Sequence, residues 1–296
     1  MNRHIITLIR PHQWLKNLFV FTPLFFDRHA TDWSYVWPSV VAFTAFCLVA
    51  SGIYCLNDIH DAEADCQHPV KRMRPVACGA VSKRAAYATM GILWTAALTL
   101  VAWQCFHSGS IQKGLIGTLL FYTVINVAYC IKLKQVALLD VFIIATGFVL
   151  RIVAGGLATG IILSHWIVLT TFLLALFLAV AKRRDDAAIY ETSGVMPRMN
   201  VKRYNMDFLG SAIAIQGSVT IMCYILYTVS DDVVERIGSH YLYTTSVFVL
   251  AGILRYMQLT FVDRKSGSPT KVLLNDKFIQ ICVAGWLTTF TIILYM

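Results

Sequence analysis

Long apolar runs separated by short polar stretches dominate this sequence. Eight of these runs are long enough to cross the hydrocarbon core of a membrane as helices, since a crossing takes about 17 to 25 mostly apolar residues. They lie near residues 36–56, 85–106, 114–131, 138–159, 164–181, 211–229, 241–262 and 277–296. A ninth run, Leu18 to Phe26, is short and contains Pro23, so it must extend or tilt to cross. The pattern predicts an all-α, polytopic membrane protein with about nine transmembrane helices.

The composition agrees with this fold class. Of the 296 residues, 57% are apolar and 14% are charged, and this apolar share is well above that of an ordinary soluble domain. The polar stretches between the runs are too short to form a separate soluble domain. We therefore expect a single transmembrane catalytic domain over residues 1–296, in which the longest inner connections, about 57–84 and 182–210, cap the active site.

The basic residues predict the orientation of the chain. With nine spans and the N-terminus inside, the inner segments hold 20 of the 25 Lys and Arg residues, the outer segments three and the spans two. Cytoplasmic segments of membrane proteins carry such an excess. We expect a location in the cytoplasmic (inner) membrane, with the N-terminus and the active site on the cytoplasmic side. The net charge of +9 then reflects topology and contact with anionic headgroups, not nucleic acid.

A carboxylate cluster begins where the first secure span ends. Asp58, Asp61 and Asp65 lie at positions i, i+3 and i+7, and Asn57 lies one turn before Asp61, so on a helix all four share one face. A divalent cation would relieve their mutual repulsion, and Mg²⁺ binds through one or two carboxylates plus substrate phosphates. We predict that Asp58, Asp61 and Asp65 are catalytic and bind Mg²⁺. The alternative interpretation is a solvated acidic helix end.

Basic side chains follow this cluster at a short distance along the chain. Lys71, Arg72 and Arg74 supply donors that suit the phosphate oxygens of a substrate. The alternative is an ordinary cytoplasmic basic stretch. The carboxylates and these cations together predict a site for a phosphorylated ligand at the inner mouth of the bundle.

A second polar segment emerges on the same side after the sixth span. Lys182, Arg183 and Asp186 predict a second polar wall, in which the cations bind a phosphate and the carboxylate orients a ligand or a metal. The alternative is anchoring by cations at an inner helix end. We expect the two polar segments to be counterparts in two halves of a bundle.

Ionisable groups inside the spans are the next candidates. Asp140 and Arg151 are eleven residues apart, which places them on nearly the same helix face. Arg151 should face the bundle interior or a wet cavity, because a charge in lipid is costly. A structural pairing with a carbonyl or carboxylate explains it equally well. The other predicted substrate contacts are Lys16, Asn17, Asn57, Asn126, Tyr129 and Lys134.

These residues resemble a known family. The run Asn57-Asp58-x-x-Asp61-x-x-x-Asp65 after the second of nine spans resembles the UbiA superfamily of intramembrane prenyltransferases. The phosphoribosyltransferase branch of that superfamily is similar in a wider set of motifs. They are Arg10-Pro11-x-Gln13-Trp14-x-Lys16-Asn17, His68-Pro69-x-Lys71-x-x-Arg74-Pro75, Leu139-Asp140 with Gly147-Phe148-x-x-Arg151, and Lys182-Arg183-x-x-Asp186.

The resemblance implies a reaction and its substrates. That branch transfers 5-phosphoribose from phosphoribosyl diphosphate to a polyprenyl (decaprenyl-like) phosphate and releases diphosphate. It implies Mg²⁺ as cofactor, the membrane lipid and the soluble donor as partners, and no nucleic acid; a homo-oligomer is compatible with it. Prenyl-transferring members carry a second Asp-x-x-x-Asp motif, whereas here Tyr190 stands four residues after Asp186. Asp186 also stands where the branch usually has Glu, which shortens its reach.

Two other functions remain open from the sequence. The first is a prenyltransferase that moves an isoprenoid diphosphate onto an aromatic acceptor, such as a quinone or haem precursor. The missing second aspartate motif argues against it. The second is a lipid-phosphate transporter without chemistry, which should carry polar groups at mid-membrane on several spans. Only Arg151 clearly meets that description.

Overall fold

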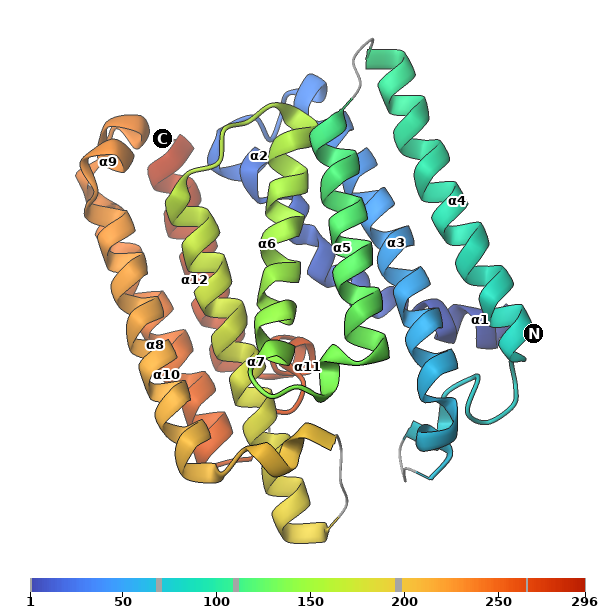
Figure 1. Ribbon diagram of the computed structural model, residues 1–296. Helices are drawn as coiled ribbons and strands as arrows, with labels where there is room; N and C mark the ends of the chain where they lie inside the picture. Colours follow the sequence, from blue (N-terminus) through green and yellow to red (C-terminus); the bar gives the residue numbers. More distant parts are fainter. Residues whose placement is uncertain (1, 68–70, 109–111, 195–198, 265, 296) are drawn as a thin grey trace. The chain divides into compact units, whose positions relative to one another are not determined.

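A computed structural model of the chain describes residues 2–67, 71–108, 112–194, 199–264 and 266–295, and all regular structure within these ranges is helical. His68 and Pro69, quoted above as part of a motif, lie outside the described residues. The all-α fold class predicted from the apolar runs is confirmed. Figure 1 shows the helices in chain order.

Seven of the described helices are long and apolar enough to cross a membrane. They are α3 (Trp33–Cys66), α4 (Lys83–Ser108), α5 (Lys113–Ile131), α6 (Leu139–Thr159), α7 (His165–Ser193), α8 (Met206–Val229) and α12 (Lys277–Tyr295). An eighth crossing is possible by length if α9 (Asp231–Ile237) and the helical segment His240–Phe261, which ends in α10 (Ser246–Phe261), count as one span broken by a bend of 109°. Each of the eight apolar runs predicted as spans is therefore helical.

The N-terminal segment differs from an ordinary span. It consists of α1 (Asn2–Ile9), a 3₁₀ helix (Pro11–Phe21) and the short helix α2 (Thr22–Phe26). None of these is among the helices long enough to cross alone. A 3₁₀ helix rises about 2.0 Å per residue and an α-helix about 1.5 Å, so Pro11 to Phe26 can cover about 30 Å, roughly the hydrocarbon thickness. The ninth span stays a prediction.

The chain divides into two compact units. Unit 1 comprises Met1–Lys134 and Gly147–Leu163, and unit 2 comprises Gln135–Thr146 and Ser164–Met296. The boundary falls within α6, whose first residues belong to unit 2 and whose remainder belongs to unit 1. A single catalytic domain over the whole chain stays a prediction.

In unit 1, α3 is the central helix. It packs along α4 and α5, and α1 and the 3₁₀ segment also lie against it (Figure 1). Glycines allow two of the closest approaches. A Cβ on Gly52 of α3 would lie 2.1 Å from the Trp94 indole nitrogen, and a Cβ on Gly155 of α6 would lie 2.0 Å from the Val20 carbonyl oxygen. These contacts set the positions of α4 and α6 in this unit.

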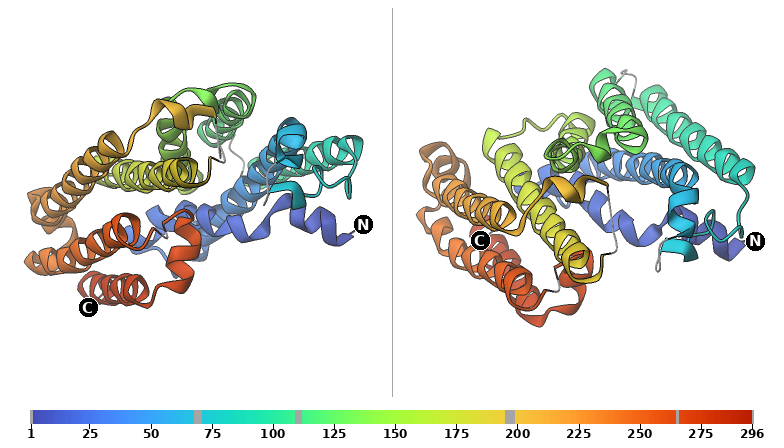
Figure 2. Two further views of the ribbon diagram at one scale, coloured as in Figure 1. Left: turned by 90° about the horizontal axis from the view of Figure 1, so that it is seen from below. Right: turned by 60° about the horizontal axis from the view of Figure 1, so that its bottom comes forward.

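In unit 2, α7 packs along α8, and α10 lies beside both α8 and α12 (Figure 2). Its core contains Phe177 of α7, Ile213 of α8 and Phe290 of α12, all fully buried. The short helix α11 (Pro269–Asn275) precedes α12. Helix α7 ends at Gly194, which has a left-handed conformation with φ of 66° and donates its N–H to the Tyr190 carbonyl, as glycine commonly does after a helix.

Both predicted inner connections begin as helix, which corrects the loop boundaries. Helix α3 continues ten residues past position 56, to Cys66, and α7 continues past 182, to Ser193. At the end of α3, Ile59 and Ala62 form an apolar face next to the carboxylates and pack in one cluster with Val76 and Ala86. The apolar face keeps this polar stretch helical.

Candidate active site

The N-terminal segment runs antiparallel along α3 and leads to the predicted carboxylate cluster. Three side-chain contacts set its register: Arg10 with Asp58, Trp14 with Ser51, and Asn17 with Cys47. The Trp14 indole N–H donates to Ser51 Oγ at 3.0 Å. The Asn17 amide lies 3.1 Å from Cys47 Sγ. The motif around Arg10 therefore positions side chains on α3.

Asp58 lies at the centre of the cluster and is only 1% exposed. Its Oδ1 accepts a hydrogen bond from the Arg10 guanidinium and lies 3.5 Å from Arg74 Nη1. Its Oδ2 is buried and has no hydrogen-bond partner among the described residues. A buried carboxylate oxygen without a partner is costly, so Oδ2 marks a position that suits a cation or a donor.

The other two carboxylates also lie against basic side chains. Lys134, just after α5, donates to Asp61 Oδ1. Arg74 Nη1 donates to Asp65 Oδ2 at 2.6 Å, and Asp65 is 4% exposed. The structure thus brings together five of the predicted site residues, Asp58, Asp61, Asp65, Arg74 and Lys134, within unit 1.

The residue types in this cluster fit Mg²⁺, although the three carboxylates are not arranged as a ready set of metal ligands. In the part of the chain that the structure describes, no three His, Cys, Asp or Glu side chains form a ready metal site. Carboxylate oxygens are hard ligands of the kind that Mg²⁺ prefers, and Asp58 Oδ2 is available. Arg10, Arg74 and Lys134 supply the positive charge that such an ion would bring. The magnesium assignment stays a prediction.

A second polar group in unit 1 surrounds Arg151. Its Nε donates to Asn17 Oδ1 at 2.7 Å, its Nη1 to the Gly147 carbonyl at 2.6 Å, and its Nη2 to the Tyr122 hydroxyl at 3.1 Å. The guanidinium also lies 5.1–5.5 Å from the ring centres of Phe46, Tyr122 and Phe148. These neutral partners satisfy a buried cation. The predicted pairing of Arg151 with a carbonyl is confirmed, and substrate contact stays a prediction.

In unit 2, Asp140, Arg183 and Asp186 form a buried ion cluster. Arg183 is fully buried and donates to Asp140 Oδ2 at 2.6 Å and to Asp186 Oδ2 at 2.9 Å. The Tyr204 hydroxyl donates to Asp140 Oδ1 at 3.0 Å and accepts from the Leu138 N–H at 2.7 Å. Burial raises the pKa of Tyr204 to about 12, and Asp140 acts in the same direction, so the phenol stays protonated. Arg183 is thus bound to carboxylates of its own chain in this conformation.

The remaining predicted contacts are more dispersed. Asn126 donates to the carbonyl of Tyr122 on its own helix at 2.8 Å, which satisfies its amide locally. Arg72 is exposed, and five others are partly buried: Lys16, Asn57, Lys71, Tyr129 and Lys182. Their roles in substrate binding stay predictions.

The prediction of the site omitted Arg10, Tyr122 and Tyr204. Arg10 was part of the quoted N-terminal motif, so its place beside Trp14 and Asn17 was the available signal. Tyr122 and Tyr204 carry no such signal, because a tyrosine in an apolar run or a loop is ordinary. They become visible only through their hydrogen bonds to Arg151 and Asp140.

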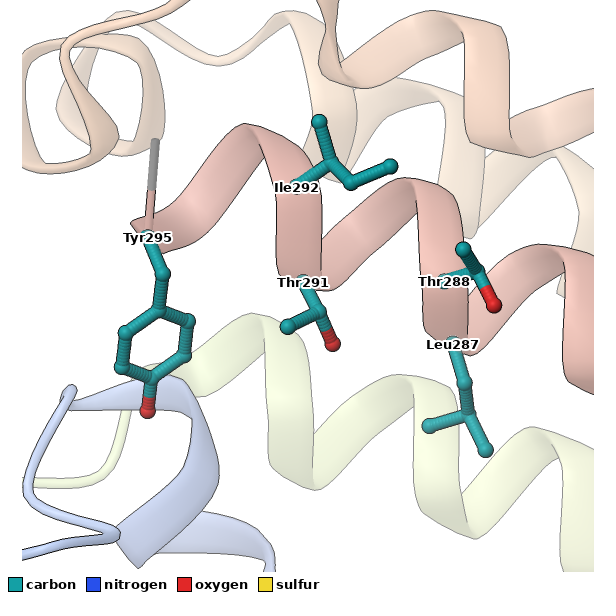
Figure 3. Close-up of a pocket in the computed structure, with 5 residues that line it drawn as sticks. All are labelled: Leu287, Thr288, Thr291, Ile292 and Tyr295. Atoms are coloured by element: carbon teal, nitrogen blue, oxygen red, sulfur yellow. The ribbon is translucent and has the colours of Figure 1, made fainter.

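A groove on α12 contains none of the predicted site residues. It has a volume of about 370 Å³ and is lined by Leu287, Thr288, Thr291, Ile292 and Tyr295. Figure 3 shows Leu287, Thr291 and Tyr295 projecting from one side of the helix. The lining is largely apolar and lacks charged groups, so this groove is not the predicted phosphate site.

The fold and the carboxylate cluster agree with a defined family. The model of the UbiA prenyltransferase family matches residues 19–282, and the chain belongs to this family. Decaprenyl-phosphate phosphoribosyltransferase from Mycolicibacterium smegmatis is 33% identical over 302 residues, which cover 98% of this chain and 92% of that protein. The protein of the same name from Corynebacterium glutamicum is 31% identical over 305 residues, covering 99% and 87% respectively.

A solved structure has the same fold. A UbiA homologue from Archaeoglobus fulgidus bound to GPP and Mg²⁺ superimposes with a TM-score of 0.70 over 99% of this chain and 100% of that chain, at 17% identity. The predicted UbiA-like bundle is confirmed. The protein is a multi-pass membrane protein of this family.

Proposed function

We propose that this protein transfers 5-phosphoribose from phosphoribosyl diphosphate to a polyprenyl phosphate and releases diphosphate. The proposal makes it a Mg²⁺-dependent pentosyltransferase of the cytoplasmic membrane, with its active site on the cytoplasmic side. The observation that carries it is the likeness, over nearly the whole chain, to phosphoribosyltransferases at 31–33% identity. The cluster of three carboxylates and three cations in unit 1 supports it chemically.

The donor would bind at the end of α3. Asp58, Asp61 and Asp65 would hold Mg²⁺, which supplies neutralising charge to the leaving diphosphate. Arg74 and Lys134 lie against these carboxylates, and Lys16, Lys71 and Arg72 would add further donors for phosphate oxygens. Guanidinium groups suit this role because they bind phosphate oxygens through two parallel hydrogen bonds.

The chemistry needs no general base. A phosphate oxygen of the lipid forms a bond to the anomeric carbon while the bond from that carbon to diphosphate breaks. The attacking oxygen is already an anion, so no proton has to be removed. Catalysis then consists of positioning the two substrates and neutralising the departing charge.

The lipid phosphate would approach from the hydrocarbon, and the soluble donor from the cytoplasm. We propose that two basic residues in the second half of α7, Lys182 and Arg183, receive the phosphate of the lipid. In the described conformation Arg183 is paired with Asp140 and Asp186, so binding there requires it to exchange partners. Lys182, the preceding residue on α7, is partly buried.

The main rival function is prenyl transfer. The family as a whole and the solved homologue bound to GPP and Mg²⁺ are compatible with it. Two sequence features disfavour it here: Tyr190 stands where prenyl-transferring members carry the last aspartate of their second motif, and the segment Lys182-Arg183-Arg184 is basic. A basic segment suits a lipid substrate that carries a phosphate group.

The test is transfer of label by the purified protein. Protein in liposomes receives Mg²⁺, phosphoribosyl diphosphate labelled in the ribose, and a polyprenyl phosphate, and the label is followed into the organic phase. We expect label in the lipid, and we expect a metal chelator to abolish its appearance. Label that remains in the aqueous phase, with protein that is folded, would contradict the proposal.

A further inference from the structure

Arg10 is the basic residue that donates a hydrogen bond to Asp58 at the candidate metal site. Its guanidinium donates to Oδ1 of the buried Asp58 and lies 5.2 Å from the ring centre of Tyr54. The arginine itself is about one-fifth exposed, whereas Asp58 is almost completely buried. Arg10 therefore covers Asp58 from the solvent side.

The backbone holds Arg10 in this position. The carbonyl of Ile9 accepts a hydrogen bond from Ser51 Oγ at 2.9 Å, and Ser51 is fully buried on α3. Arg10 itself has a left-handed backbone with φ of 51°, and Pro11 follows it. A residue other than glycine in this conformation is uncommon, and such residues gather at functional sites. The segment thus aims one guanidinium at one carboxylate.

The two oxygens of Asp58 have different surroundings. Oδ1 receives Arg10 and lies near Arg74, while Oδ2 is buried without a partner among the described residues. A divalent ion on Asp58 would face the guanidinium of Arg10 at short range. Two cations at one buried carboxylate repel each other, so the ion and Arg10 compete for Asp58.

We propose that Arg10 is an exchangeable counter-ion of Asp58, which is released when Mg²⁺ binds and then contacts the diphosphate of the donor. This inference rests on the proposed function, because it takes the ion and the diphosphate from it. Without metal, Arg10 neutralises Asp58 and keeps the buried cluster stable. With metal and diphosphate, the freed guanidinium finds new anionic oxygens next to the site it has left.

The proposed exchange follows from the charges at this end of α3. Asp58 and Asp65 carry two negative charges, and Arg10 and Arg74 balance them in the described conformation. Adding Mg²⁺ alone would leave an excess of positive charge at this end of α3. The negative charge of diphosphate offsets this excess, so we expect metal and diphosphate to bind cooperatively.

The experiment compares Arg10→Ala with wild type in detergent, using thermal unfolding and calorimetric binding of Mg²⁺ and inorganic diphosphate. We expect Arg10→Ala to unfold at a lower temperature without metal, and Mg²⁺ to restore much of the loss. Mg²⁺ alone should bind the variant more tightly than wild type. At saturating Mg²⁺, diphosphate should bind the variant about 10-fold more weakly, the effect of one lost charge-assisted hydrogen bond.

A purely structural Arg10 gives a different pattern. Its removal would lower the unfolding temperature to the same extent with and without Mg²⁺ and leave the affinity for diphosphate unchanged; this result would overturn the proposal. Arg3→Ala, on the exposed side of α1, is the matched control and should change neither affinity. If Arg10→Ala does not fold, Arg10→Lys takes its place, and the same shifts in smaller size are expected.

The design separates this inference from the proposed function. Wild type that binds neither Mg²⁺ nor diphosphate would contradict the proposed function itself. Wild type that binds both, with Arg10→Ala indistinguishable from it, would contradict only the counter-ion role.

Discussion

At the scale of single residues, the buried carboxylates at the end of α3 need basic partners that neutralise their charge. Asp58 and Asp65 are buried and share the cation Arg74, while Arg10 and Lys134 contact Asp58 and Asp61. Burying such groups is favourable only when each has a partner. These pairs stabilise the end of α3, and we propose that the same cluster binds a metal and a phosphorylated ligand.

The first prediction concerns Asp58. Asp58→Asn should lower turnover by roughly 100-fold or more, because a preorganised charge in the site is lost, while the protein remains folded and extractable. Glu63→Gln is the control on the same helix end: the Glu63 side chain is 92% exposed, and its variant should keep normal turnover. Initial rates of both purified variants decide the matter, and near-normal turnover of Asp58→Asn would refute the metal-site assignment.

The second prediction concerns Arg151. Arg151→Lys should lower the free energy of unfolding by about 2–4 kcal/mol, because the shorter cation leaves Asn17 Oδ1 and the Tyr122 hydroxyl without their donor. Arg255→Lys is the control: Arg255 pairs with Asp276, both side chains are partly exposed, and a lysine can keep this ion pair, so the change should cost at most about 1 kcal/mol. Denaturation in detergent measures both. Unchanged stability with weaker substrate binding would make Arg151 a ligand contact instead.

Residue-level prediction from the sequence worked where spacing carried the information. The i, i+3, i+7 pattern placed Asp58, Asp61 and Asp65 on one helix face, and α3 shows that face. The partners of these carboxylates could not be derived in the same way. Arg10 and Lys134 are 48 and 73 residues away in sequence from the groups they contact. No local sequence pattern predicts a contact between residues so far apart.

At the scale of elements, apolar runs predicted where helices lie but not where they end. Helices α3 and α7 continue beyond the apolar runs of the sequence. Their last turns are mostly polar, but each turn still has apolar side chains to bury. Hydropathy averaged over a window does not detect this. The N-terminal segment shows the opposite case, since its apolar stretch with Pro11 and Pro23 forms 3₁₀ and short α-helical pieces.

The third prediction concerns the packing of α6 on the N-terminal segment. Gly155→Ala should lower the free energy of unfolding by about 1–3 kcal/mol, because its Cβ would overlap the Val20 carbonyl oxygen, a backbone atom that no rotamer change can move. Gly117→Ala on α5 is the control: a Cβ there meets nothing within 4 Å, and alanine favours a helix. Thermal unfolding in detergent compares the two. Equal stability of both variants would show that the approach of α6 to Val20 is not tight.

At the scale of the whole molecule, the basic residues predict on which side of the membrane each helix end lies. They predict that the end of α3, which carries the carboxylate cluster, faces the cytoplasm. Of the eight cysteines, Cys66 and Cys78 are exposed, and both follow the carboxylates closely in sequence. They provide a direct probe of this topology.

The fourth prediction uses these thiols. A membrane-impermeant maleimide should label the protein in inverted membrane vesicles and leave it unlabelled in intact spheroplasts, because the distribution of basic residues predicts that both thiols face the cytoplasm. The double variant Cys66→Ser/Cys78→Ser should lose most of the labelling, which shows that the signal comes from these positions. Labelling from outside intact cells would reverse the orientation and place the site on the wrong side for a cytoplasmic donor.

The most direct test of the central claim is a comparison of two reactions in one preparation. Purified protein in liposomes with Mg²⁺ is given one of two substrate pairs: phosphoribosyl diphosphate with a polyprenyl phosphate, or a polyprenyl diphosphate with an aromatic acceptor. Mass spectrometry then measures the masses of the lipid products. The account predicts a lipid heavier by one phosphoribosyl group in the first mixture and no product in the second. A prenylated aromatic product in the second mixture, with the lipid phosphate of the first unchanged, would contradict it.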